Sequence, residues 1–238
     1  MTGFTKVAAY VMPEPGNSAV RRGDFESAYT GAAPWDIGAP QPAFQAVADA
    51  ITGSVLDAGC GTGDNALFLA GRGDTVTGFD FLEKPIALAK RKASERGFAA
   101  TFLVEDALRL REWTERFDNI IDSGLFHVFS NQDRAQYTQG LKTVLKPGGR
   151  LFLLCFSDET PGSVGPRRVS KQELRDAFAE GWEIESIEPA RFAVRAEART
   201  GLFAGEEPRA WFLIARRGID IGFVGEHSHG IDRKSSYR

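Results

Sequence analysis

Residues 55–63 (VLDAGCGTG) place three glycines at alternate positions directly after an apolar run. Residues 54–58 are predicted to form a short buried strand and residues 65–70 a helix, so the glycines occupy the turn between them. Glycines allow a tight strand-to-helix turn and let a ligand lie against the backbone. A strand, a glycine turn and a helix in this order are typical of α/β proteins that bind a ligand at the turn.

The rest of the chain continues this alternation. Further strands are predicted at 75–80, 100–104, 117–122, 150–156, 182–187 and 210–215. Helices are predicted near 24–29 and 43–51, at 83–96 and 131–145, and at 170–180 behind a capping box, with a turn at 146–149 (KPGG). This pattern predicts a Rossmann-like, doubly wound, mostly parallel α/β sheet. We divide the chain into a lid segment (1–53), a ligand-binding domain (54–217) and a tail (218–238).

Acidic residues accompany the first three predicted strands. Asp57 precedes the first glycine by two positions, where a carboxylate suits the ammonium group of a methionine moiety better than a pyrophosphate. Asp80 ends the second strand and can accept hydrogen bonds from both hydroxyl groups of a ribose. Asp106 follows the third strand, where its carboxylate and the backbone N–H of Ala107 can bind an adenine edge, with Glu105 as the alternative carboxylate.

Together with residues 145–149 (LKPGG), these features resemble the class I S-adenosylmethionine-dependent methyltransferase family over roughly residues 54–216. The resemblance implies a seven-stranded sheet whose last strand is antiparallel. It also implies S-adenosylmethionine as the cofactor and S-adenosylhomocysteine as its product. The cofactor site that it implies is formed by Asp57, Gly59, Gly61, Gly63, Asp80, Asp106 and Ala107.

The lid segment carries a narrower resemblance. Residues 29–31 (YTG) and 34–42 (PWDIGAPQP) resemble the N-terminal segment of thiopurine, thiocyanate and thiol methyltransferases. They are more similar still to related bacterial small-molecule enzymes, including mycobacterial methyltransferases of heterocyclic toxins. This resemblance implies that the segment covers the site and that Trp35 lies over the cofactor, where an aromatic face favours a cationic sulfonium. The alternative is that Trp35 is a structural anchor.

Residues 122–129 (DSGLFHVF) follow the fourth predicted strand. Ligands of open α/β sheets bind beyond the carboxyl ends of the strands, so this segment is expected to face cofactor and substrate, with Asp122 as a further cofactor contact. His127 is the candidate general base because its unperturbed pKa lies near neutrality, and a histidine bonded to the backbone is the alternative. Candidate aromatic walls for a flat substrate, or alternatively core residues, are Tyr29, Phe126 and Phe129.

Composition limits the partners and the compartment. The net charge is −3, whereas nucleic-acid-binding domains are usually basic, so no nucleic-acid partner is expected. The chain has no signal-like or membrane-spanning apolar run, and its two cysteines lie in apolar contexts, which predicts a cytoplasmic protein without disulfides. Asp122 and Asp158 do not complete a magnesium-binding carboxylate cluster, so no metal is expected. We expect a monomer or a homodimer.

The leading hypothesis is therefore transfer of a methyl group from S-adenosylmethionine to O, N or S of a small aromatic or heterocyclic molecule. A halide, thiocyanate or thiol methyltransferase is the first alternative, and a non-catalytic S-adenosylmethionine sensor is the second. A nicotinamide-dependent oxidoreductase is disfavoured, because the glycines are spaced G-x-G-x-G rather than G-x-G-x-x-G.

Overall fold

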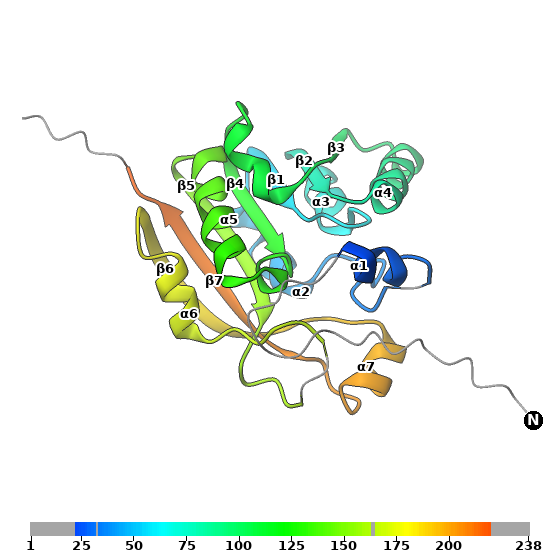
Figure 1. The fold of residues 1–238 in the computed structure, drawn as a ribbon. Coiled ribbons are helices and arrows are strands. Elements are labelled where there is room, and N and C mark those ends of the chain that lie inside the picture. Colours follow the sequence, from blue (N-terminus) through cyan, green and yellow to red (C-terminus); the bar gives the residue numbers. More distant parts are fainter. Residues whose placement is uncertain (1–21, 32, 163–164, 220–238) are drawn as a thin grey trace, which may run out of the picture.

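The computed structural model describes residues 22–31, 33–162 and 165–219. Within these residues, seven strands form one sheet in the order β3-β2-β1-β4-β5-β7-β6 (Figure 1). The strands are β1 (Ser54–Ala58), β2 (Thr75–Asp80), β3 (Ala100–Val104), β4 (Phe117–Ser123), β5 (Leu145–Phe156), β6 (Trp182–Arg191) and β7 (Arg209–Arg217). Strands β1 to β5 pair in parallel, and β7 is antiparallel to both neighbours. The expected mostly parallel sheet with an antiparallel last strand is confirmed.

The described helices are α1 (Arg22–Ala28), α2 (Pro42–Ala46), α3 (Asp64–Ala70), α4 (Glu83–Arg96), α5 (Asn131–Val144), α6 (Lys171–Ala177) and α7 (Ala196–Leu202). The predictions at 83–96 and 131–145 are confirmed to within one residue by α4 and α5. The helix predicted near 43–51 is divided, because Val47 leaves helical geometry (φ −115°, ψ 11°) between α2 and the 3-10 turn η1 (Ala48–Ala50). None of the described helices is long and apolar enough to span a membrane.

Three further elements differ from the prediction. Helix α6 has the expected capping box but ends at Ala177 rather than Glu180, since Phe178 leaves the helix and buries its ring. Residues 146–149 were expected to form a turn. They lie inside β5 instead, at the point where the pairing of β5 with β4 is interrupted. Helix α7 was not predicted. Ala198 is its one buried residue, so its sequence shows no helical periodicity of apolar residues.

Two hydrophobic cores cover the two faces of the sheet, because neighbouring residues of a strand point to opposite faces. Ile121 and Phe152 pack in the core that includes side chains of α3 and α4. Their neighbours Ile120 and Leu151 pack in the core that includes side chains of α5 and α6. The central strands are therefore apolar on both faces, as parallel strands between two helix layers require.

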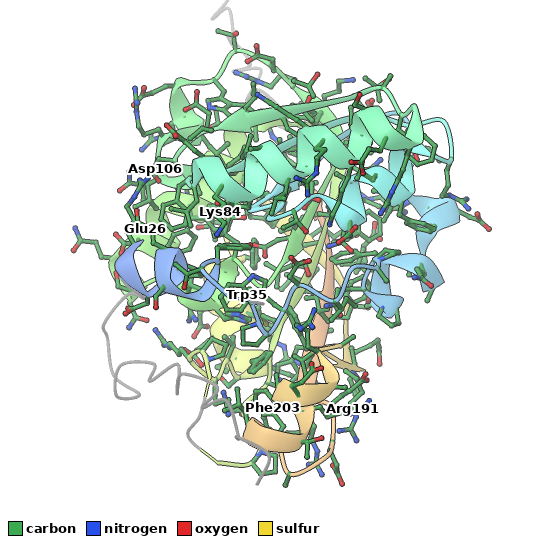
Figure 2. All side chains as sticks on the ribbon, turned by 90° about the vertical axis from the view of Figure 1, so that its right-hand side faces the viewer. Glu26, Trp35, Lys84, Asp106, Arg191 and Phe203 are labelled. Carbon is green, nitrogen blue, oxygen red and sulfur yellow. The ribbon has the colours of Figure 1, made fainter. Side chains whose placement is uncertain are left out.

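The parallel strands end at one edge of the sheet, and α1 and α7 lie on that side (Figure 1). Figure 2 shows Trp35 between Lys84 of α4 and Phe203, which follows α7. The Lys84 ammonium donates a hydrogen bond to the Tyr29 carbonyl, and the Arg195 N–H donates to the Pro34 carbonyl at 2.9 Å. The described part of the lid segment is thus held over the carboxyl edge of the sheet from two sides.

Candidate functional site

A cavity of about 360 Å³ opens at the carboxyl edge of the parallel strands. One end lies beyond β2 and β3 and the other beyond β4 and β5, on either side of β1. The predicted site residues that line it are Tyr29, Trp35, Gly59, Gly61, Asp80, Asp106, Ala107, His127 and Phe129. Those that do not line it are Asp57, Gly63, Asp122 and Phe126. Among the described residues, no group of three or more His, Cys, Asp or Glu side chains is placed to hold a metal ion.

The glycine turn forms the cavity wall at the end of β1. Gly59, Gly61 and Gly63 have φ values of 69°, 53° and 83°, which other residues rarely adopt. The Cys60 N–H donates to the Phe79 carbonyl at 2.8 Å and fixes the turn against β2. Gly59 and Gly61 therefore present backbone to the cavity, while Gly63 starts α3 and packs against α4.

Asp80 ends β2 with its carboxylate at the cavity. Oδ2 accepts a hydrogen bond from the Gly61 N–H at 3.2 Å, and Oδ1 accepts one from the Leu82 N–H at 2.9 Å. Burial raises the pKa of Asp80 to about 6. Because a carboxylate has about four acceptor sites, about two remain for hydroxyl groups of a ligand.

Asp106 and Ala107 follow β3, the strand next to β2. Asp106 caps the 3-10 helix η2 (Ala107–Glu112) by accepting a hydrogen bond from the Leu108 N–H at 2.9 Å. Glu105 lines the same end of the cavity, so both carboxylates stay candidates for binding a base. The order of Asp80 and Asp106 along the sheet edge suits a nucleoside whose ribose lies beyond β2 and whose base lies beyond β3.

Asp57 is fully buried just before the glycine turn, and neither carboxylate oxygen has a hydrogen-bond partner among the described residues. Burial raises its pKa to about 8; the nearby Ala66 N–H offsets part of this rise, and the carboxylates of Asp122 and Asp80 add to it. The protonated form of Asp57 is therefore favoured at neutral pH in the protein without ligand. Its contact with an ammonium group stays a prediction, because Asp57 does not line the cavity.

We expect the protein without ligand to lose stability as pH rises from about 4 to 8. The pKa values of Asp57, Asp80 and Asp122 are raised to about 8, 6 and 7, so the folded protein binds protons more tightly than the unfolded chain in this range. Asp57→Asn removes one such group. Between pH 5 and 8 the free energy of unfolding of the variant should therefore fall less than that of the wild type, and the two decreases should differ by on the order of 1–3 kcal/mol. Denaturant unfolding at several pH values measures this difference.

Asp118→Asn provides the control. The hydrogen bond from Lys146 lowers the pKa of Asp118 to about 2, so this carboxylate stays ionised between pH 5 and 8 and its replacement should leave the pH slope unchanged. Equal slopes for wild type and Asp57→Asn would contradict the raised pKa of Asp57.

Asp122 lies near the end of β4 and is buried with its hydrogen bonds made. It accepts from the Tyr137 hydroxyl at 2.9 Å and from the Phe126 N–H at 3.1 Å. The Phe126 ring is itself buried in the core beside α5 and α6. Both residues thus hold the turn that carries His127, and their predicted ligand contacts stay predictions.

The lid segment is attached by its side chains. Trp35 Nε1 donates to the Tyr29 hydroxyl at 3.1 Å, with the two rings nearly perpendicular (84°). Gln41 is 3% exposed and pairs with the Ala193 backbone in both directions, each bond being 2.9 Å long. The Gln41 N–H also donates to Asn65 Oδ1 at 2.8 Å. The segment is therefore tied both to α3 and to the chain between β6 and α7.

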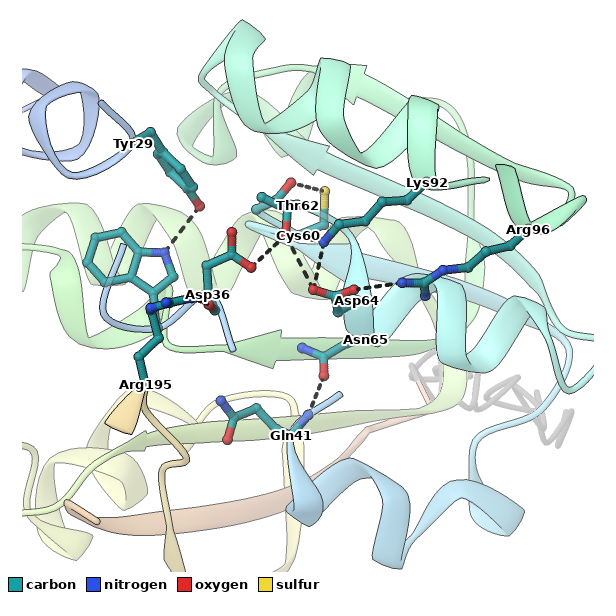
Figure 3. Close-up of polar contacts among 12 residues, drawn as sticks. Tyr29, Asp36, Gln41, Cys60, Thr62, Asp64, Asn65, Lys92, Arg96 and Arg195 are labelled. Carbon is teal, nitrogen blue, oxygen red and sulfur yellow. Dashed lines mark hydrogen bonds and ion pairs between the residues drawn. The ribbon is translucent and has the colours of Figure 1, made fainter. Parts of the chain in front are cut away.

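A polar network joins the lid segment to the helices around the glycine turn (Figure 3). Thr62 Oγ1 donates to Asp36 Oδ1 at 2.9 Å. Lys92 Nζ donates to Thr62 Oγ1 and to Asp64 Oδ2, both at 2.8 Å, and Arg96 lies 3.6 Å from Asp64 Oδ1. The position of the lid segment is thereby coupled to that of the glycine turn.

His127 lines the other end of the cavity from the 3-10 turn η3 (Phe126–Val128). Its Nδ1 accepts a hydrogen bond from the Phe156 N–H at 3.0 Å. Burial, with Arg134 and Arg168 nearby, lowers the pKa of His127 to about 3, so the ring is neutral at physiological pH. The alternative stated for His127, a histidine bonded to the backbone, is therefore present. A role of His127 as a general base stays a prediction.

Sequence reasoning missed most of the aromatic residues at this end. The Phe156 ring lies 5.1, 5.2 and 5.8 Å from the rings of His127, Phe192 and Phe203, and all four line the cavity. No local pattern marks Phe192 or Phe203, because they lie beside Phe156 only once β7 pairs with β5 and α7 packs near it.

Comparison with known proteins gives relatives over most of the chain. A family model for a methyltransferase domain matches residues 55–149. The chain is 39% identical over 180 residues to 2-heptyl-1-hydroxyquinolin-4(1H)-one methyltransferase of Mycobacteroides abscessus, a match that covers 70% of this chain and 79% of the relative. It is 32% identical over 181 residues to probable thiol methyltransferase 2 of Arabidopsis thaliana, covering 72% and 79%.

Solved structures agree with these relatives. A structure from work on the conversion of a disulfide bond into a thioacetal group during echinomycin biosynthesis has 40% sequence identity and a TM-score of 0.71, covering 82% of this chain and 91% of that chain. Structures with 20–22% identity and TM-scores of 0.55–0.65 share the fold and contain S-adenosylmethionine or S-adenosylhomocysteine. Both resemblances drawn from the sequence are confirmed.

Proposed function

The chain is a member of the S-adenosylmethionine-dependent methyltransferase family and acts on a small molecule, and from this premise we propose that its acceptor is a flat aromatic or heterocyclic compound methylated on O, N or S. The observation that carries the proposal is the continuity of the cavity. It joins the glycine turn and Asp80 at one end to Phe156, Phe192 and Phe203 at the other.

The residues beyond β2 and β3 fit S-adenosylmethionine. Asp80 retains acceptor sites for the ribose hydroxyl groups, and Asp106 or Glu105 offers an acceptor for the adenine amino group. Gly59 and Gly61 present backbone that can lie against the methionine end. Trp35 supplies an aromatic face, which favours a cationic sulfonium.

When bound, the cofactor supplies a methyl group on a positively charged sulfur, and an acceptor atom can displace that sulfur in line. The contribution of the chain is then to bind, orient and exclude water. The aromatic residues restrict the acceptor to a plane, and the described part of the lid segment covers the site while attached through Asp36 and Gln41.

Aromatic walls favour a planar acceptor, because stacked and edge-to-face ring contacts add to the burial of apolar area. The Mycobacteroides relative is named for a hydroxyquinolinone, which supports this class. The Arabidopsis relative is named for thiols, which makes a thiol acceptor the second candidate. The net charge of −3 gives no support to a nucleic-acid acceptor.

A methyl-transfer assay over hydroxyquinolinones, phenols, thiopurines, aliphatic thiols, thiocyanate and iodide tests the proposal. We expect aromatic acceptors to exceed the small anions in kcat/KM by at least about 10-fold, because the anions bury little apolar area. Phe192→Ala should lower kcat/KM for aromatic acceptors by about 10-fold and leave S-adenosylhomocysteine binding unchanged.

The matched control is Phe98→Ala, because Phe98 is 36% exposed and does not line the cavity. A preference for aliphatic thiols or anions would favour the second candidate. No product from any aromatic acceptor, with S-adenosylhomocysteine still bound in calorimetry, would contradict the proposal.

A further inference from the structure

The hydrogen bonding of His127 constrains the chemistry of the acceptor. The ring is 5% exposed and lies 5.1 and 6.0 Å from the rings of Phe156 and Phe192. Its Nδ1 accepts a hydrogen bond from the Phe156 N–H at 3.0 Å, and an imidazole nitrogen that accepts such a bond carries no proton. A neutral imidazole has one N–H, so in His127 the proton lies on Nε2.

The Nε2–H of His127 borders the cavity. Among the described residues it has no hydrogen-bond acceptor, and the unpartnered polar atoms that are fully enclosed belong to other side chains. Because His127 lines the cavity, this N–H is open to a bound molecule. An N–H that faces the cavity and has no acceptor in the described part of the protein can donate a hydrogen bond to an acceptor atom of the ligand.

The surroundings oppose protonation of the ring. The charged groups that act on it are the guanidinium groups of Arg134 and Arg168, and its ring neighbours are aromatic. A general base works best when its pKa is near the working pH, and burial with these cations holds the pKa of His127 near 3. Protonation at Nδ1 would also break the hydrogen bond from Phe156.

Building on the proposed function, we propose that His127 is a neutral hydrogen-bond donor through Nε2, and that the acceptor arrives already ionised, as the oxygen or sulfur anion of an acidic phenol, N-hydroxy heterocycle or aromatic thiol. The anion supplies the electron pair of the new bond to the methyl carbon. The bond from that carbon to the sulfonium sulfur breaks, and its electron pair stays on the sulfur. No proton passes to the protein, and the Nε2–H holds the anion through another of its lone pairs.

The tautomer is tested without cofactor or substrate, by NMR of protein labelled with ¹⁵N in histidine. The chain contains three histidines, and His127→Gln identifies the signal of His127. We expect a neutral ring with the proton on Nε2 throughout pH 5 to 8. A proton on Nδ1, or titration within this range, would overturn the donor role.

Two variants separate the two hydrogen bonds of His127. His127→Asn keeps an acceptor near the Phe156 N–H but falls short of the cavity, whereas His127→Gln brings an amide N–H close to the position of Nε2. With thiophenols of graded acidity, His127→Asn should lose about 10–100-fold in kcat/KM, and His127→Gln should lose less. Thermal unfolding shows whether each variant is folded.

The pH profiles decide between donor and base. For the wild type we expect kcat/KM to inflect at the pKa of each thiophenol in turn. An inflection at one fixed pH, the same for every thiophenol, would overturn the proposal in favour of a base. Asp133, a carboxylate that also lines the cavity, is the rival base, and a fixed inflection that disappears in Asp133→Asn would overturn the proposal too.

The two proposals fail in different ways. No product from any aromatic acceptor, hydroxyquinolinones and thiopurines included, would contradict the proposed function. A proton on Nδ1 in the NMR experiment would overturn the donor role while leaving methyl transfer to aromatic acceptors intact.

Discussion

Replacing Asp80 with alanine is expected to weaken the binding of S-adenosylhomocysteine about 100-fold. The carboxylate lies on the cavity wall and spends one acceptor site of each oxygen on the N–H groups of Gly61 and Leu82. Its remaining sites can each accept a ribose hydroxyl, and a hydrogen bond to a charged group contributes about 1.5–3 kcal/mol. Loss of two such bonds corresponds to about 3 kcal/mol or more, which is a factor of about 100 in Kd.

Isothermal titration calorimetry measures this effect, and Asp74→Ala is the matched control. Asp74 precedes the other end of β2 and binds the Gly53 N–H at 3.1 Å, far along the strand from the cavity. We expect its Kd to stay within about twofold of the wild type, because it offers nothing to the ligand. An unchanged Kd in a folded Asp80→Ala protein would remove Asp80 from the cofactor site.

Gly63→Ala is expected to destabilise the protein by about 2–5 kcal/mol. The φ of +83° costs a residue with a side chain about 1–2 kcal/mol. In addition, a Cβ at this position would lie 2.9 Å from the Ala89 Cβ and 3.0 Å from the Phe102 ring, and such overpacking costs about 1–3 kcal/mol. For a chain of this size, Tm should fall by roughly 5–15 °C.

Gly97→Ala separates the two causes. Gly97 ends α4 with a φ of +68°, and a Cβ there would meet nothing within 4 Å. This variant should therefore lose only the backbone part, about 1–2 kcal/mol. Equal losses of Tm in the two variants would show that Gly63 is not packed against α4 as closely as the structure has it.

The sheet could be predicted because its signals are local. The run of apolar residues in β5 and the apolar centre of β4 mark buried parallel strands without reference to the rest of the chain. The capping box of α6 likewise needs only Ser170 and Glu173. Helix α7 shows no such signal, since its place depends on packing rather than on its own pattern.

The site could be predicted where residues follow strand ends. Asp80 and Asp106 lie at the cavity because the ends of neighbouring parallel strands meet at one edge. Position along a strand gives the face to which a side chain points but not whether the cavity reaches it, and Asp57 and Asp122 are buried behind the wall instead. The attachment of the lid segment through Gln41 could not be predicted from the sequence, because its partner Ala193 lies 152 positions away.

The paired hydrogen bonds between Gln41 and Ala193 have a consequence for synthesis on the ribosome. Gln41 and the glycine turn emerge well before Ala193, so during synthesis the lid segment lacks its attachment to the chain between β6 and α7 until that residue has been made. At about 5–20 residues per second, 152 positions correspond to a delay of roughly 8–30 s. The full attachment of the lid segment therefore forms only after most of the polypeptide has been made, and a chain interrupted before Ala193 keeps only the attachments near the glycine turn and α3.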